Sequence, residues 1–556
     1  YLANFNYKGD EFRELKKFSA KIYNSNGELL KTIKMSDIVT SGWTNDYTLI
    51  NNIKYYFFKP KSPIYPYTIV YEYTINWKNG IVQFPSFFPQ RNFNLSIEKA
   101  SYSLKIPENI KFQYKTNLLS EQKTVSNKDE IIYEWEVNNI SALKDENFKS
   151  NFIELVPYLY IHPTSFTYGE NKGLIDSWES MGKWNYELIK NRDILNQETK
   201  EKIIELTKEA KTDREKVSIL YDYLGKTTRY ISIQVGIGGY QPMLASEVCR
   251  TGFGDCKALS NYLKAMLSVV GIKSVYCIIK LDNSDKTFFH DYADFCQMNH
   301  VILQVPLPND TLWLECTNPQ IPFGFVHNGI SGHDVLLITE NGGVLSKTTD
   351  YADSLNIESY CSKVEILQDG SANISTKKRC KIKEYDKNSQ FIFKSPSEQV
   401  DILRKEINLP NVTIEKIKNT KNKSSLPELN IDYTWRTSLY GSKTGNRIFI
   451  PVNPFREATE ISKRNDRKQN IEIINGERKL DSIELVLPNE YEIESIPPTV
   501  KLETAFGKLF FNVSIIDNKI LLQQGKWDVS MYNDFLNFLE KINSTFRSMI
   551  IIRRKS

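Results

Sequence analysis

The hydrophobic and polar positions of this chain follow one period in its first part and another in its middle. Over residues 18–163 apolar side chains alternate with polar ones, most regularly in 67–77 and 131–137, and turn residues separate the runs. Such alternation is typical of strands that bury one face. We therefore expect the chain to open with an antiparallel β domain of the sandwich type.

The period changes after Gly173, where apolar residues begin to recur at three- and four-residue steps. This spacing corresponds to one face of a helix and predicts helices over 177–191, 199–210 and 213–224. Asp213 is expected to be the N-cap of the third. The middle of the chain is therefore expected to combine helices with the strands that follow them.

A further helix is predicted over 258–270, directly after the stretch Gly252-Phe253-Gly254-Asp255-Cys256-Lys257. The glycines predict a turn that places Cys256 in the first turn of the helix. There the free N–H groups and the positive end of the helix dipole favour a thiolate, the nucleophilic form of sulfur. The alternative interpretation is that Cys256 is a small apolar core residue at a helix start.

Two strands, 299–305 and 311–317, follow this helix and are joined by turn residues. They predict an antiparallel hairpin with His300 early in one strand and Glu315 late in the other. The two side chains are therefore expected to lie near each other at one end of the ribbon. A histidine at the start of a buried strand can also be an ordinary core residue, so this interpretation stays open beside the catalytic one.

From about residue 356 the alternation returns and predicts a second β domain. Strands over 362–367 and 371–382 turn at Asp369-Gly370, a strong hairpin signal. Cys361 and Cys380 flank this hairpin and could be cross-strand neighbours, and the sequence leaves open whether they pair.

Composition excludes several classes of protein. Lys plus Arg number 72 against 67 for Asp plus Glu, and the two signs are interspersed, which argues against a nucleic-acid partner. No apolar run approaches the roughly 20 residues of a transmembrane helix. The seven cysteines fit neither a disulfide scaffold nor a paired-CxxC zinc site, and no calcium cage of carboxylates is visible. The glycine run at 236–239 lacks the Lys-Ser/Thr of a P-loop, so neither a metal nor another cofactor is expected.

Cysteine, histidine and glutamate occur here in an order that suits nucleophilic catalysis. Cys256 would supply the thiolate, His300 the imidazole that stabilises it and later protonates the leaving amine, and Glu315 the carboxylate that orients the ring. His290 lies in a polar loop where exposure explains it, and it receives no catalytic role; His327 and His333 follow the core strands without metal-ligand spacing.

The region 229–337 resembles the transglutaminase-like, papain-related superfamily, in particular bacterial members whose core lies between two β domains of unknown function. The motifs that carry the resemblance are Tyr240-Gln241-Pro242, Gly254-Asp255-Cys256-Lys257, Asn299-His300-Val301, Trp313-Leu314-Glu315-Cys316-Thr317, Pro322-Phe323-Gly324 and Val335-Leu336-Leu337.

The resemblance implies that Cys256 is the nucleophile, His300 the base and Glu315 the third member of the triad, a position at which many members have Asp. An oxyanion donor must act beside the N–H of Cys256; Gln241 is the first candidate and Gln234 the second.

We expect a multidomain α+β protein with a transglutaminase-like core, 173–350, between mainly antiparallel β-sandwich domains, 1–172 and 351–556. The predicted reaction is acyl transfer on a peptide, protein or peptidoglycan-like amide through a thioester, with hydrolysis favoured over transamidation by analogy. The alternative is a catalytically silent scaffold that binds peptide or glycan through its β domains. The resemblance and the first residue, Tyr1, suggest export to the periplasm or cell surface. The sequence leaves the oligomeric state open.

Overall fold

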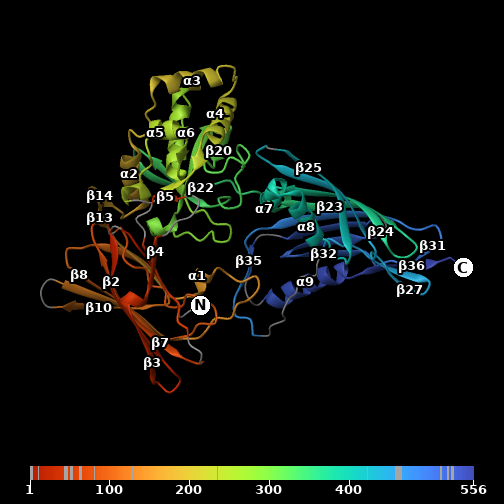
Figure 1. The fold of residues 1–556 in the computed structure, drawn as a ribbon, viewed down its shortest axis with the longest axis horizontal. Coiled ribbons are helices and arrows are strands. Elements are labelled where there is room, and N and C mark those ends of the chain that lie inside the picture. Colours follow the sequence, from red (N-terminus) through yellow and green to blue (C-terminus); the bar gives the residue numbers. More distant parts are fainter. Residues whose placement is uncertain are drawn as a thin grey trace.

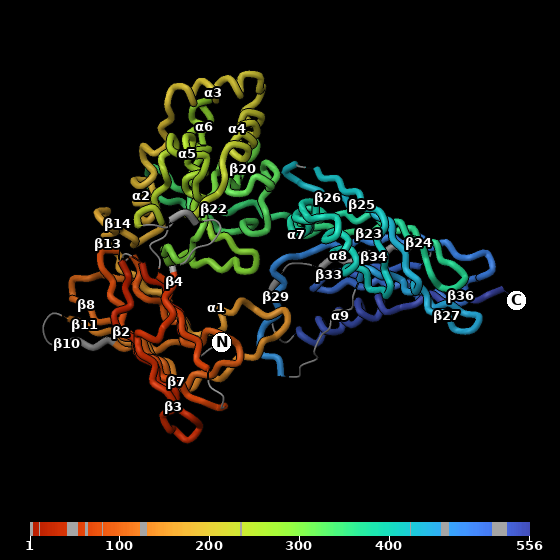
Figure 2. The backbone as a smooth tube through the Cα atoms, viewed as in Figure 1, coloured from red at the N-terminus to blue at the C-terminus, as the bar shows by residue number. Residues whose placement is uncertain are grey.

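The computed structural model describes residues 4–10, 12–42, 48–50, 54–61, 65–80, 82–126, 130–233, 236–422, 424–456, 466–513, 516–522, 525–527 and 531–555. The chain forms three lobes, with the helices of the middle lobe standing above the N-terminal and C-terminal β lobes (Figure 1). The backbone passes through the three lobes in sequence order (Figure 2). The fold is therefore the mixed α+β class with β-rich flanking regions that the sequence predicts.

Several small antiparallel sheets build the N-terminal lobe. Strand β2 (Arg13–Tyr23) pairs with β3 (Leu29–Lys34) and β7 (Thr68–Trp77), and this sheet buries Phe18, Ala20 and Ile22. The other elements of this lobe are β1 (Phe5–Gly9), η1 (Met35–Asp37), β4 (Val39–Gly42), β5 (Thr48–Ile50), β6 (Lys54–Phe58), β8 (Ile97–Pro107), β9 (Phe112–Asn117), β10 (Ser120–Ser126), β11 (Glu130–Ile140), α1 (Phe152–Leu155), β12 (Tyr158–Pro163), β13 (Ser165–Tyr168) and β14 (Asn171–Leu174).

The middle lobe combines helices with a five-stranded antiparallel sheet of order β20-β19-β18-β21-β22. The three predicted helices are present, but the side chain of Thr212 caps the third, so the prediction of Asp213 as its N-cap was wrong by one residue. The elements are α2 (Trp178–Ile189), α3 (Gln197–Thr207), α4 (Asp213–Thr227), β15 (Arg229–Tyr230), β16 (Ser232–Ile233), η2 (Gly236–Gly239), α5 (Ala245–Thr251), β17 (Phe253–Gly254), α6 (Cys256–Val269), β18 (Val275–Ile279), η3 (Phe295–Gln297), β19 (His300–Leu307), β20 (Asp310–Leu314), β21 (Asp334–Thr339) and β22 (Gly342–Lys347).

Helix α6 is the buried centre of the middle lobe. Its apolar face, including Leu259, Leu263 and Met266, packs in one cluster with Leu303 of β19 and with residues of α4 and α5. Burial of a side chain of this size contributes about 1.5–3 kcal/mol of transfer free energy. The helix therefore holds its first turn in a fixed position relative to the sheet.

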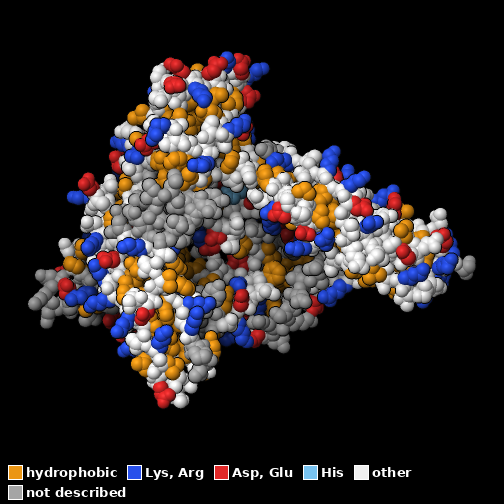
Figure 3. All heavy atoms as spheres, in the orientation of Figure 1, with side chains coloured by type: hydrophobic (Ala, Val, Ile, Leu, Met, Phe, Trp, Pro, Cys, Tyr) orange, Lys and Arg blue, Asp and Glu red, His pale blue; other side chains and the backbone are white. Residues whose placement is uncertain are grey.

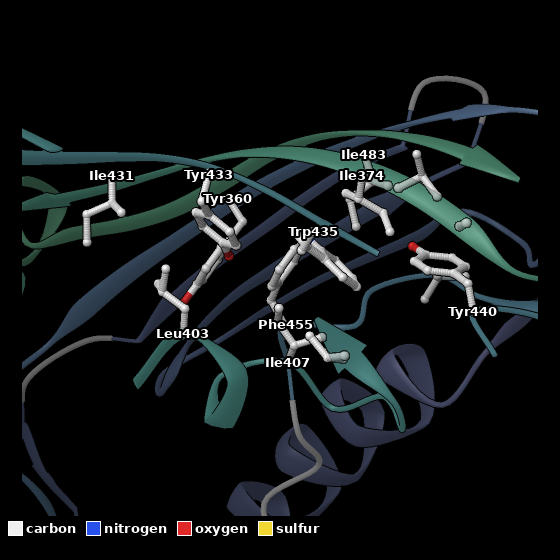
Figure 4. Close-up of a cluster of buried hydrophobic side chains, with 14 of the residues drawn as sticks. Tyr360, Ile374, Leu403, Ile407, Ile431, Tyr433, Trp435, Tyr440, Phe455 and Ile483 are labelled. Atoms are coloured by element: carbon white, nitrogen blue, oxygen red, sulfur yellow. The ribbon is translucent and has the colours of Figure 1, made fainter. Parts of the chain in front are cut away.

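The C-terminal lobe is built on an eight-stranded sheet of order β25-β26-β24-β23-β30-β34-β33-β32, antiparallel except for the parallel pair β23 and β30. Aromatic and aliphatic side chains, Trp435 and Tyr440 among them, fill the space between this sheet and the elements below it (Figure 4). The elements are η4 (Asp353–Leu355), β23 (Ile357–Ile366), β24 (Ala372–Lys381), α7 (Lys383–Asn388), η5 (Ser389–Phe393), α8 (Pro396–Lys405), β25 (Val412–Asn422), β26 (Glu428–Thr437), β27 (Ser442–Thr444), β28 (Arg447–Pro451), β29 (Ile471–Ile473), β30 (Glu477–Val486), β31 (Tyr491–Ser495), β32 (Val500–Thr504), β33 (Gly507–Asn512), β34 (Ile516–Leu522), β35 (Gly525–Trp527), α9 (Tyr532–Phe546) and β36 (Met549–Arg554).

The hairpin predicted at Asp369-Gly370 is confirmed as β23 and β24, but the suggestion that its two cysteines are neighbours is wrong. Cys361 lies opposite Lys377, and Cys380 lies opposite Glu358. Cys361 is exposed on one face of the sheet while Cys380 is buried on the other, and both are free thiols. Side chains on opposite faces of a sheet cannot form a disulfide.

The N-terminal and C-terminal lobes also contact each other directly. The Arg467 guanidinium donates to the carbonyls of Asn147 (2.7 Å) and Phe148 (2.9 Å). The Gln469 amide donates to the carbonyl of Lys144 (2.8 Å). The three lobes therefore close around a central hollow, and charged side chains of both signs lie around it (Figure 3).

Within the described ranges, the structure contains no helix with the length and apolar character needed to span a bilayer. The predicted domain boundaries after residues 172 and 350 stay a prediction.

Candidate active site

The turn before α6 places Cys256 at the first position of the helix. Gly252 ends α5 in the left-handed conformation (φ 69°), and the next residues form β17, which pairs with β15. Asp255 then caps α6, because its Oδ1 accepts the N–H of Ala258 at 3.0 Å. A helix start leaves the first N–H groups without intrahelical acceptors, and Cys256 lies in this first turn. The sequence prediction of Cys256 in the first turn is confirmed.

His300 and Glu315 meet at one end of the hairpin formed by β19 and β20. His300 is the first residue of β19, and Glu315 directly follows the last residue of β20. The Nε2 of His300 lies 2.7 Å from Oε2 of Glu315, and both side chains are buried. The hairpin predicted from the sequence is confirmed, and the ring nitrogen that faces away from Glu315 is Nδ1.

The charge of Glu315 controls the ionisation of His300. Burial alone would lower the pKa of His300, but the negative charge of Glu315 and hydrogen bonds with Cys256 and Glu315 outweigh it and raise the pKa to about 10. Burial acts to raise the pKa of Glu315, yet the His300 charge and hydrogen bonds hold it well below its usual range. The arrangement therefore favours an imidazolium between a carboxylate and the sulfur.

Glu315 receives donors from three further directions. Its Oε1 accepts the backbone N–H (2.8 Å) and the hydroxyl (2.6 Å) of Thr317. Its Oε2 lies 3.4 Å from Nε2 of His327, whose Nδ1 accepts the N–H of Gly329 (3.2 Å). His327 Nε2 must then carry the proton. The carboxylate is thus shared between two histidines and cannot rotate without losing several hydrogen bonds.

Sequence reasoning gave His327 no role because it lies outside any strand pattern and has no ligand spacing. The only signal available was its position two residues before a glycine that supplies the N–H to its ring. That signal is too common to identify a functional residue, so His327 could be found only from the structure.

A cavity of about 410 Å³ opens in front of Cys256 and His300. Its walls come from α6, from β18 and β19, from the glycine turn η2, and from the N-terminal lobe. A volume of this size suits a small ligand or a few residues of a peptide. The side chains that line it include Asp10, Arg13, Tyr168, Asn185, Tyr240, Lys257, Tyr276 and Phe295.

Lys257 brings a buried cation next to the nucleophile. It follows Cys256 in α6, lines the same cavity, and forms an ion pair with Asp255. Both side chains are almost fully buried. A buried ion pair of this kind is strongly destabilised when one partner is removed, because the other charge is left unpaired.

Among the described residues, the side chain predicted as the first oxyanion donor does not line this cavity. The Gln241 amide donates to the carbonyl of Leu188 at 3.2 Å, and Gln241 is not among the residues that line the cavity. Gln234 lies outside the described residues. The backbone N–H of Cys256, at the helix start, is the remaining predicted donor.

His290 lies apart from the triad. Its Nε2 lies 2.8 Å from Oδ1 of Asp334, and its side chain is 65% exposed. Among the residues that the structure describes, no cluster of three or more His, Cys, Asp or Glu side chains could hold a metal ion.

Comparison with protein families agrees with this geometry. Residues 200–317 match the transglutaminase-like superfamily, residues 3–144 a domain of unknown function (DUF3857), and residues 446–552 a second one (DUF3858). The chain therefore carries a transglutaminase-like domain flanked by these two domains, as the sequence motifs indicate.

One solved structure shares the fold over nearly the whole chain. A "putative protease" from Parabacteroides distasonis matches with a TM-score of 0.61 and 14% identity over 99% of this chain and 92% of that one. A "putative cysteine protease" from Cytophaga hutchinsonii covers 62% of this chain and 90% of its own, at 9% identity and a TM-score of 0.21, too low to support an argument. No curated protein matches the chain significantly.

Proposed function

We propose that the protein is a thiol-dependent acyl-transfer enzyme that acts on peptide or other carboxamide bonds. The observation that carries the proposal is the buried hydrogen bond between His300 and Glu315 beside the cysteine that begins α6. Burying an imidazolium and a carboxylate has a large desolvation cost. In this proposal the pair serves to stabilise the thiolate of Cys256 through the positive charge of the ring.

The proposed reaction proceeds through a thioester. The Cys256 sulfur attacks the carbonyl carbon, and the N–H of Cys256 donates to the oxygen that becomes negative. As the C–N bond breaks, His300 gives its Nδ1 proton to the departing amine. Water then attacks the thioester, His300 accepts a proton from it, and the carboxylic acid is released with the free thiolate. Glu315 stays ionised and holds the ring in place throughout.

Hydrolysis is proposed over transamidation because the neighbour from Parabacteroides distasonis, which shares the fold, is described as a "putative protease". Peptides, proteins and peptidoglycan-like amides are the substrate classes that this reaction admits. Export to the periplasm or cell surface remains part of the proposal, on the basis of the resemblance to bacterial members.

The decisive experiment combines reactivity with turnover. Wild-type protein is incubated with a proteome-derived peptide mixture, and new termini are identified by mass spectrometry. Cys256→Ala should abolish cleavage, whereas Cys361→Ala, which removes an exposed thiol on another lobe, should leave it unchanged.

The scaffold alternative makes the opposite prediction. If Cys256 reacts with iodoacetamide no faster than Cys361, and if Cys256→Ala changes no measurable product, the enzyme proposal is wrong. A binding role for the β lobes would then be the better interpretation.

A further inference from the structure

Part of the cavity wall belongs to the N-terminal lobe, for which the family comparison gives no function. Asp10 and Arg13, at the turn into β2, line the same cavity as Cys256 and His300. A side chain in this position would face any substrate that reaches the sulfur.

Asp10 fixes the orientation of Arg13. One carboxylate oxygen, Oδ1, accepts the N–H groups of Phe12 (3.0 Å) and Arg13 (2.8 Å). The other, Oδ2, accepts Nε (2.9 Å) and Nη2 (2.5 Å) of the guanidinium. The oxygens of Asp10 are therefore used within its own turn, and its role is to hold the arginine.

The guanidinium keeps one edge available. Its centre lies 5.7 Å from the Trp77 ring, so one face packs against an aromatic side chain. Among the described residues, none accepts a hydrogen bond from Nη1. The edge formed by Nη1 and the second hydrogen of Nη2 can thus donate two parallel hydrogen bonds, the geometry that matches a carboxylate.

The charged side chains around the cavity occur in pairs, so the free edge of Arg13 matters more than net charge. The basic side chains along it are Arg13, Lys257 and the imidazolium of His300, which are paired with Asp10, Asp255 and Glu315 in that order. Asp10 is the one acidic residue among the described residues that line it, and its oxygens are occupied. A carboxylate placed near Arg13 would therefore meet a donor edge and no free acceptor that repels it.

We propose that Arg13 is a specificity-determining residue that binds a substrate carboxylate close to the amide bond attacked by Cys256. This inference rests on the proposed function. The carboxylate has two possible sources, the free C-terminus of a peptide or the side chain of an Asp or Glu residue, and both present the same two oxygens.

The first test measures binding without turnover. On the Cys256→Ala variant, the dissociation constant of N-acetyl-Ala-Ala is compared with that of its C-terminal amide by calorimetry. The free acid should bind about 10- to 100-fold more tightly, the range expected for a hydrogen bond to a charged group. Adding Arg13→Gln should remove the difference, and adding Lys16→Gln, an exposed cation on the same strand, should preserve it.

The second test measures cleavage. Peptide pairs that differ only in Glu against Gln, or in a free against an amidated C-terminus, are compared by kcat/KM and separate the two sources. Arg13→Gln should lower kcat/KM for the acidic member of the preferred pair about 10- to 100-fold and leave its neutral partner unchanged.

The failures of the two proposals are distinguishable. Cysteine-dependent cleavage without carboxylate preference overturns the role of Arg13 and keeps the acyl-transfer function. Absence of any cleavage that depends on Cys256 overturns the function, and the calorimetric comparison on the Cys256→Ala variant still decides the role of Arg13. The role of Arg13 is overturned if the C-terminal acid and its amide bind equally and if N-acetyl-Ala-Glu-amide also binds no more tightly than N-acetyl-Ala-Gln-amide.

Discussion

Two cavities border the proposed triad, and they differ in the side chains that line them. The front cavity, about 410 Å³, reaches the sulfur and the ring of His300 and is bordered by the N-terminal lobe. The rear cavity, about 480 Å³, reaches Glu315 and His327 and is bordered by α7 and η5 of the C-terminal lobe. The front carries Arg13 and Lys257 with Asp10, whereas the rear carries Asp282 and Asp386 with Lys387.

This difference indicates separate tasks for the two β lobes. Under the proposed function, a group in the front cavity can reach the sulfur of Cys256, while a group in the rear cavity can act on it only through Glu315 and His327. Substitutions in front should therefore alter which substrate is used or whether reaction occurs at all. Substitutions behind should alter the ionisation of the triad, with smaller effects.

The largest expected effect is that of His300 itself. His300→Gln should lower kcat/KM by about 10³-fold or more, because both the stabilisation of the thiolate and the proton donor are lost. His290→Gln, which removes an exposed histidine outside the triad, is the control and should change kcat/KM less than twofold. Similar losses in both variants would show that the front cavity is not the reaction site.

A comparable loss is expected for the carboxylate behind the ring. Glu315→Gln should lower kcat by about 10²- to 10⁴-fold with a smaller change in KM, because the neutral amide can no longer hold the imidazolium. Thr317→Val, which removes one donor to Glu315, should cost about tenfold or less. If Glu315→Gln retained most of the activity, the third member of the triad would have to be sought elsewhere.

The pH dependence of stability should reflect the ion pair of His300 and Glu315. The pKa of His300 is raised to about 10, so its contribution is complete below the unfolded value of about 6.5 and is lost as pH rises through about 10. The pKa of Glu315 is lowered, so its contribution is present above about 4.3 and is lost as pH falls through the depressed value. The difference in Tm between wild type and His300→Gln should thus be largest near pH 5–6 and shrink by pH 10; a difference that grows with pH would contradict the assignment.

His327 should show a smaller effect of a distinct kind. His327→Phe removes one of the interactions that keep the pKa of Glu315 low, so the acidic limb of kcat/KM should move to higher pH. We expect kcat to fall about 3- to 10-fold with KM unchanged. A merely structural role would lower the yield of folded protein without moving the limb. The pH profile of the purified variant therefore separates the two roles.

The smallest effect is expected for the rear wall. Asp386→Asn changes the group that accepts the N–H of Asn328 at 2.9 Å and should cost about 1 kcal/mol of stability at most. Its kcat/KM should stay within twofold of wild type. A loss as large as that of Arg13→Gln on its preferred substrate would remove the distinction between the two cavities.

The elements that can be predicted from the sequence are those determined by local pattern. Helix α6, the hairpin of β19 and β20, and the position of Cys256 follow from apolar spacing and from the glycine turn. Sequence reasoning missed the place of Arg13 at the cavity, because many elements separate this residue from Cys256, and it missed the contact of His327 with Glu315, because the loop after β20 carries no periodic pattern that predicts its course. The sequence also suggested Gln241 as the oxyanion donor, because a motif gives no information on the Leu188 carbonyl to which its amide donates.

The contact of Arg467 and Gln469 with the N-terminal lobe bears on what counts as the smallest working piece of this protein. The segment that matches the transglutaminase-like superfamily, 200–317, contains the proposed triad but neither wall contributed by the flanking lobes. Because the two flanking lobes also contact each other, we expect deletion of one to displace the other. Exchanging the N-terminal lobe between homologues, with the contacts of Arg467 and Gln469 retained, is therefore a route to change substrate choice without altering the chemistry.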